Sequence, residues 1–170
     1  MRFSRRNMAL AIGCTTTAAV LVAIVVVGTP NFRQELSPAK DTIFARKILM
    51  GAIDMNMDEI ETMLAPEGKL DLAEGQENAE TISTMLLAFP HMFPPRTNQW
   101  KPGADRDPAT DTFASPAVWT DFTDFYQRST SASKLAFSAS RAKRAVDFKP
   151  LIAELRTNCD ACHAIYMKNN

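Results

Sequence analysis

The sequence has 170 residues, of which 46% are hydrophobic and 22% are charged, which is enough apolar material for one globular domain with its own core. This composition excludes a disordered tail. The 19 basic and 19 acidic residues cancel, and without a basic surplus we predict no binding of nucleic acid.

The first 28 residues are predicted to direct export. Arg2, Arg5 and Arg6 form a positive start without any acidic residue, and residues 8–28 are apolar apart from three threonines and Cys14. This pattern is typical of a signal peptide, but 21 residues are also about enough to span a bilayer. The segment is therefore either a cleaved signal peptide or an N-terminal membrane anchor, and in both cases the remaining chain lies in the periplasm. Cys14 is interpreted as a small apolar filler.

Residues 29–42 are predicted to be a polar linker, and the first helix follows it. Apolar residues there recur every seven positions, at Ile43, Met50, Met57 and Leu64. This spacing is typical of an amphipathic helix. Pro66 lies after its end.

A second helix is predicted over 72–89, with Pro90 as its stop. Residues 90–116 hold six of the ten prolines and predict a long irregular connection. Ser115 is a good N-cap, and Pro116 suits the first position of a third helix.

The third helix is predicted to keep one apolar face from Val118 to Ala139. A fourth helix is predicted to begin near Asp147 and to tolerate Pro150 in its first turn. No stretch alternates with period two for long enough to form a strand. Residues 43–170 are therefore predicted to form an all-α domain, an antiparallel four-helix bundle with one long middle connection.

The predicted last helix carries the pattern C-x-x-C-H, with Cys159, Cys162 and His163. This is the attachment motif of one covalent haem c. Positions i, i+3 and i+4 share a helix face, so both sulfurs can bind the haem vinyl groups while the imidazole reaches the iron.

Other interpretations of the motif explain fewer of these residues. A structural zinc site needs four ligands, and only His91 and Cys14 remain to complete one. A thioredoxin-like dithiol is expected near a βαβ pattern, which is absent from the sequence. A disulfide within a helical C-x-x-C has poor geometry and leaves His163 unexplained. Finally, a metal-free helical adaptor requires the motif to be coincidental.

The motif near the C-terminus of an exported, all-helical chain resembles the cytochrome c′ family, the class II c-type cytochromes. Four stretches carry the resemblance, which covers about residues 37–167: RKILMGAIDMNMDEI (46–60), LLAFPHMFPP (86–95), AVWTDF (117–122) and CDACHAIYM (159–167). The family often has Arg or Lys directly after the tyrosine of the motif, where Met167 stands here.

The resemblance implies roles for two residues of the first helix. Arg46 lies on the apolar stripe, where a buried guanidinium needs a carboxylate, and the resemblance implies a haem propionate; the alternative is an arginine that reaches water at the bundle end. Met50 falls where the family has its distal residue, and methionine there can be the second axial ligand of the iron, opposite His163. Its alternative is core packing, which we also predict for Met57. His91 is predicted to be a surface imidazole rather than a ligand.

We therefore expect a non-enzymatic electron carrier with one haem c, which serves redox partner proteins outside the cytoplasmic membrane. The alternative is a five-coordinate, high-spin protein that binds NO or CO over an open iron, with Met50 only packing. Relatives of this fold often form antiparallel dimers, so the sequence also leaves undecided whether the chain forms a homodimer through the first helix.

Overall fold

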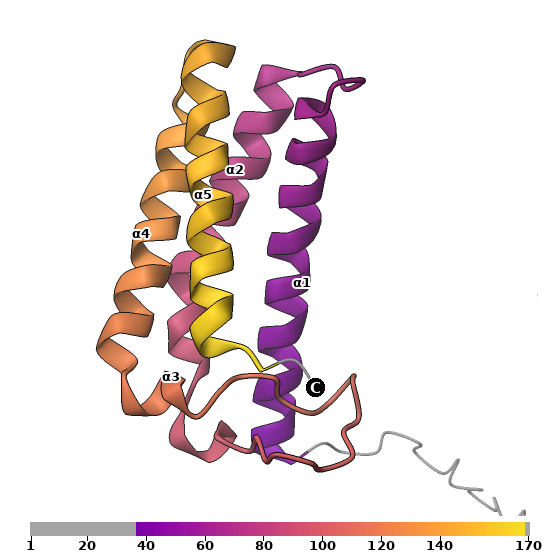
Figure 1. Cartoon of the computed structure of the whole chain (residues 1–170), viewed down its shortest axis with the longest axis vertical. Coiled ribbons are helices and arrows are strands. Elements are labelled where there is room, and N and C mark those ends of the chain that lie inside the picture. Colours follow the sequence, from indigo (N-terminus) through magenta and orange to yellow (C-terminus); the bar gives the residue numbers. More distant parts are fainter. Residues whose placement is uncertain (1–36, 169–170) are drawn as a thin grey trace, which may run out of the picture. The chain divides into compact units, whose positions relative to one another are not determined.

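The computed structural model describes residues 37–168, and all of their regular structure is helical (Figure 1). The predictions for the export segment and Cys14 fall outside these residues. In chain order, the elements are α1 (Pro38–Leu64), α2 (Leu72–Ala88), the 3-10 turns η1 (Phe89–Met92) and η2 (Pro95–Thr97), α3 (Ala117–Thr120), α4 (Phe122–Ser140) and α5 (Ala145–Tyr166). No helix among the described residues has the length and apolarity needed to cross a membrane.

The first helix begins earlier than the sequence pattern indicates. Ser37 caps α1, since its Oγ accepts a hydrogen bond from the backbone N–H of Lys40 at 3.3 Å, and Pro38 occupies the first turn. The last five residues of the predicted linker, 38–42, are therefore helical. The apolar stripe alone could not show this, because it starts only at Ile43.

The third helix is broken near its start, so the prediction of one continuous element is wrong. Asp121 has φ −131° and ψ 53°, which separates the short α3 from α4. The Asp121 carboxylate accepts a hydrogen bond from the backbone N–H of Asp124 at 3.4 Å and so caps α4. The apolar face at Val118 and Phe125 continues across the break because both side chains are buried in the same cluster.

The four long helices form an antiparallel bundle, as predicted (Figure 1). The turn between α1 and α2 lies at the same end as the turn between α4 and α5, and the long connection crosses the opposite end. The backbones of α1 and α2, α2 and α4, and α4 and α5 pack closely, whereas those of α1 and α5 hardly approach each other. This leaves space between α1 and α5.

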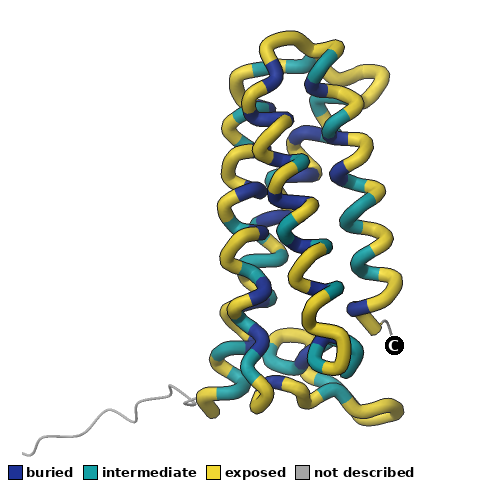
Figure 2. The backbone as a smooth tube through the Cα atoms, turned by 90° about the vertical axis from the view of Figure 1, so that its left-hand side faces the viewer, coloured by how far each residue is buried: buried dark blue, intermediate teal, exposed yellow. Residues whose placement is uncertain are grey.

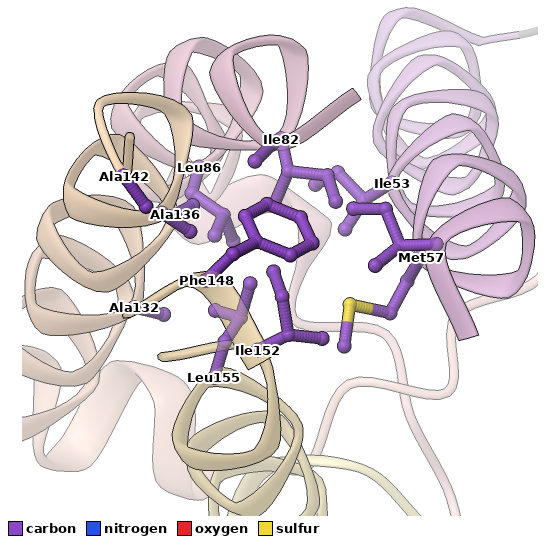
Figure 3. Close-up of a cluster of buried hydrophobic side chains, with 13 residues drawn as sticks. Ile53, Met57, Ile82, Leu86, Ala132, Ala136, Ala142, Phe148, Ile152 and Leu155 are labelled. Atoms are coloured by element: carbon purple, nitrogen blue, oxygen red, sulfur yellow. The ribbon is translucent and has the colours of Figure 1, made fainter. Parts of the chain in front are cut away.

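Side chains fill the bundle near the α1–α2 and α4–α5 turns (Figure 3). Phe148, Ile60 and Leu155 are completely buried there, and the ring of Phe148 lies against Gly75 of α2, where an alanine methyl group would lie 3.0 Å from Cζ. Buried positions recur at helical spacing along each long helix (Figure 2). This apolar core stabilises the bundle.

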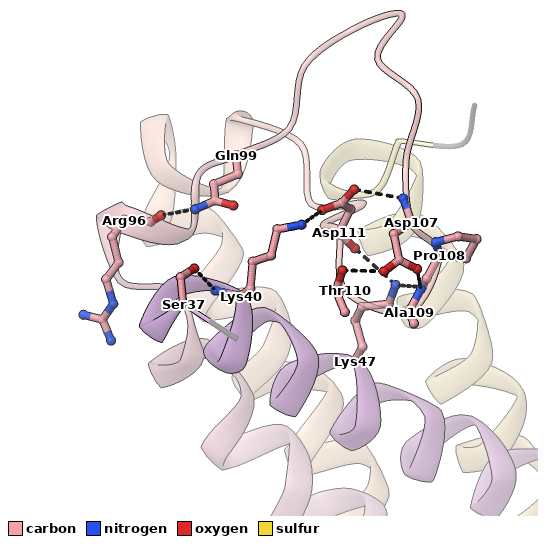
Figure 4. A network of polar contacts seen from close by, with 10 residues as sticks. All are labelled: Ser37, Lys40, Lys47, Arg96, Gln99, Asp107, Pro108, Ala109, Thr110 and Asp111. Atoms are coloured by element: carbon pink, nitrogen blue, oxygen red, sulfur yellow. Dashed lines mark hydrogen bonds and ion pairs between the residues drawn. The ribbon is translucent and has the colours of Figure 1, made fainter. Parts of the chain in front are cut away.

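Polar contacts hold the long connection on the start of α1 (Figure 4). Lys40 forms an ion pair with Asp111 at 2.8 Å, and Lys47 donates to the carbonyl oxygens of Pro108 and Asp111. The connection also pairs with the end of the chain through an isolated bridge between Ala114 and Met167. The long connection is therefore held both to the start of α1 and to the residue that follows α5.

Candidate functional site

A pocket of about 460 Å³ opens between α1 and α5 in the half of the bundle nearest the long connection. Its volume lies in the range that holds organic cofactors. The walls are mostly apolar, and the chemically distinctive residues among those lining it are Arg46, Lys47, Met50, Asp54, Arg128, Arg156, Asn158, Cys159, Cys162 and His163. The structure thus brings all five predicted site residues to one cavity.

The wall from α5 carries the attachment motif. Cys159, Cys162 and His163 are all half-buried and line the pocket from consecutive turns of one helix. Cys159 and Cys162 form no disulfide, so both sulfurs are available for attachment. Burial raises the pKa of both thiols, and that of Cys162 reaches about 11, although the charge of Arg128 opposes the rise.

Arg46 presents a buried positive charge to the pocket. Only 3% of the residue is exposed, and burial lowers its pKa from 12.5 to about 10. The guanidinium donates hydrogen bonds to the hydroxyls of Thr97, at 2.9 Å, and Thr112, and it lies 4.4 Å from the ring centre of Phe93. No carboxylate among the described residues pairs with it, so its charge is not neutralised.

The remaining predicted residues are placed as follows. Met50 is partly buried and lines the pocket from α1, one turn after Arg46. Met57 is 3% exposed and belongs to the core, which confirms the packing prediction. His91 is exposed, lies outside the pocket lining and packs its ring edge-on against Tyr126 at 6.0 Å. An exposed histidine on η1 agrees with the surface prediction.

Two residues that join the helices at the pocket edge carry no signal in the sequence. Arg156 of α5 binds Glu61 of α1 through two hydrogen bonds, Nε to Oε1 at 2.6 Å and Nη2 to Oε2 at 2.9 Å. Asp58 lies 3.9 Å from the same guanidinium. This bidentate pair joins the two helices that border the opening. No local pattern could reveal it, because the partners are 95 residues apart.

The residues present fit a haem. Two thiols and an imidazole lie on one wall of an apolar cavity. At one end of the cavity, the buried guanidinium of Arg46 has no carboxylate partner among the described residues, and it matches the acidic propionates of a haem. In contrast, no group of three or more His, Cys, Asp or Glu side chains within 37–168 could hold a bare metal ion. A helical bundle with this wall defines a c-type haem protein.

Comparisons with known proteins agree. Residues 41–167 match the family described as Cytochrome C′, and the chain belongs to this family. A relative, cytochrome c-556 of Agrobacterium tumefaciens (strain II Chrys), is 29% identical over 126 residues, which cover 71% of this chain and 92% of that protein.

Solved structures show the same fold. Cytochrome c′ of Thermochromatium tepidum superposes with a TM-score of 0.66 at 20% identity, over 79% of this chain and 98% of that one. A second cytochrome c′, described as having a ligand-controlled dimer dissociation, gives 0.65 at 18% identity, over 79% and 99% of the two chains. The cofactor of this chain is accordingly one haem c, attached covalently through Cys159 and Cys162.

Proposed function

We propose that this protein carries single electrons in the periplasm, with His163 and Met50 as the two axial ligands of its haem iron. The haem, when bound, supplies an iron that takes up and releases one electron. The observation that carries the proposal is the position of Met50, which lines from α1 the same pocket that His163 lines from α5. A thioether ligand from Met50 would raise the reduction potential of the iron.

The chain's own residues contribute binding and exclusion of water. Cys159 and Cys162 fix the cofactor to α5, and the apolar walls, including Phe93 and Phe125, keep water away. Arg46 would pair with a haem propionate, which would neutralise the buried charge of its guanidinium. Arg46→Gln removes this guanidinium, so this variant should lose its native absorption spectrum at a lower temperature than the surface control Arg141→Gln.

Absorption spectroscopy of the oxidised and reduced protein, with and without CO, tests the ligand assignment. We expect a low-spin spectrum that CO barely changes. Met50→Ala should convert the iron to high spin, because it removes the sixth ligand. Met55→Ala is a matched control, since Met55 lies on the same helix but is 67% exposed.

The other outcome is a high-spin wild-type spectrum that shifts at once on addition of CO. It would leave Met50 as a packing residue over an open iron, and the protein would then be a five-coordinate binder of NO or CO. A low-spin spectrum unchanged in Met50→Ala would contradict the Met50 assignment directly.

We also propose that a second copy of the chain covers the outer face of α1. Phe44, Ile48 and Met55 are 40%, 59% and 67% exposed and form an apolar stripe opposite the buried face. A solved structure of the same fold is described as a dimer. Sedimentation should therefore give twice the monomer mass, and Ile48→Glu should reduce it to one copy; a monomeric wild type contradicts the proposal.

Residues 1–28 are proposed to bring the domain to the periplasm, as a cleaved signal or as an anchor. The mass of the mature protein distinguishes the two. A mature chain that begins after residue 28 indicates cleavage, and a full-length chain recovered with membranes indicates an anchor. Recovery of the haem-loaded protein from the cytoplasm contradicts the location.

A further inference from the structure

A charged network on α4 and α5 borders the pocket beside the second cysteine. Arg128 of α4 lines the pocket, and its Nε donates to Oδ2 of Asp124, one turn earlier, at 2.6 Å. The same carboxylate oxygen accepts a hydrogen bond from the hydroxyl of Tyr166 at 2.6 Å. Tyr166 is 5% exposed and lies three residues after His163. One carboxylate therefore fixes a cation of α4 to the end of α5.

This cation lies on the motif side of the pocket. Arg128 lines the same pocket as Cys162 and His163, and Cys162 packs against the cluster that contains Tyr166, whose hydroxyl shares the Asp124 carboxylate with Arg128. The guanidinium of Arg128 and the carboxylate of Asp124 carry opposite charges and are held together at this side of the pocket. Each therefore acts with opposite sign on a charge that the pocket takes up.

The other cations of the pocket are held elsewhere. Arg156 is bound to Glu61, Lys47 to carbonyl oxygens of the long connection, and Arg46 to two threonines. Met167, directly after Tyr166, has no charge. Arg128 is therefore the pocket cation placed beside Cys162 and tied to α5, and it comes from a different helix than the motif.

We propose that Arg128, held in place by Asp124 and Tyr166, sets the reduction potential of the haem. This inference rests on the proposed function. Reduction adds one negative charge to the site, so a fixed cation stabilises the reduced state and a fixed anion stabilises the oxidised state. Arg128 thus raises the potential, Asp124 partly offsets it, and Tyr166 keeps both at a constant position relative to Cys162.

The two charges predict shifts of opposite sign. In redox titrations of the haem-loaded protein, Arg128→Gln should lower the midpoint potential, Asp124→Asn should raise it, and Arg128→Lys should stay near the wild type. The shifts should shrink at high salt, because the Arg128 side chain is 32% exposed. Arg141→Gln is the matched control, since Arg141 follows the end of the same helix and pairs with Glu80.

Opposite shifts in Arg128→Gln and Asp124→Asn support the inference, because loss of a merely structural contact would move both in one direction. Shifts of the same sign, or an Arg128→Gln potential equal to that of the Arg141→Gln control, overturn it. If Arg128→Gln does not load haem, the direction of the Asp124→Asn shift still decides, and a lowered potential in that variant overturns the inference. A wild-type protein that lacks covalent haem, or that shows no reversible one-electron couple, instead refutes the proposed function.

Discussion

The ion pair between Arg156 and Glu61 should contribute measurably to stability, because it joins two helices whose backbones hardly approach each other. Exposed ion pairs typically contribute about 0.2–1 kcal/mol. This pair has two short hydrogen bonds, and its side chains are 31% and 40% exposed. Bidentate geometry and partial burial place its coupling near the upper end, at about 1 kcal/mol, after allowance for solvent screening.

A double-mutant cycle in urea measures this coupling on the haem-loaded protein. Arg156→Gln, Glu61→Gln and the double variant are compared with the wild type. With a urea dependence of about 2 kcal/mol per M, 1 kcal/mol moves the midpoint by about 0.5 M. Asp58, 3.9 Å from Arg156, still attracts the guanidinium after Glu61→Gln and therefore reduces the measured value somewhat.

The pair between Arg141 and Glu80 provides the matched control. Its hydrogen bond from Nη2 to Oε1 measures 2.7 Å, and its side chains are 58% and 53% exposed, so we expect a coupling of about 0.3 kcal/mol. Raising the salt concentration should weaken both couplings. Equal couplings for the two pairs at low salt would refute the reasoning from geometry and burial.

Three further outcomes are expected. Ile60→Ala should lower the free energy of unfolding by about 2–5 kcal/mol, since Ile60 is completely buried, and Ile60→Val by about 0.5–1.5 kcal/mol, as measured by denaturation. Before the haem is attached, Gly51→Ala should stabilise α1 by about 1 kcal/mol, because its methyl group meets no protein atom within 4 Å. Gly68→Ala should destabilise the protein by about 1–3 kcal/mol, because its methyl group would lie 2.2 Å from a backbone oxygen. The hydrogen bond from Lys40 holds the pKa of Asp111 below 3.8, so its stabilisation is present above that pH and is lost as the pH falls through the lowered pKa. The stability difference between wild type and Asp111→Asn should therefore vanish in acid.

The sequence was sufficient where the determinants are local. The C-x-x-C-H motif and the heptad spacing from Ile43 to Leu64 each lie within one helix, and the structure places them as predicted. Periodicity could not locate the break at Asp121, because the buried face continues across it. The sequence signal for that break was the capping pattern from Asp121 to Asp124.

The hydrogen-bond partners of the site could not be predicted. The Arg46 guanidinium reaches Thr97 and Thr112, which lie 51 and 66 residues away on an irregular connection. Two threonines in a proline-rich segment carry no pattern that distinguishes them from others there. Similarly, the sequence does not distinguish Arg128 from the other arginines, because only the fold shows that it lies beside α5.

The uneven filling of the bundle predicts that its two halves differ in local stability before the haem is attached. Side chains alone complete the half that contains Ile60 and Phe148, whereas the half around Cys162 encloses the pocket. Amide hydrogens of α1 near Ile60 should therefore be protected from exchange even before the haem is attached, and those near Arg46 only afterwards. α5 runs from the filled half into the pocket half, so we expect the part of the helix around Phe148 to hold the two thiols in place before the haem is attached.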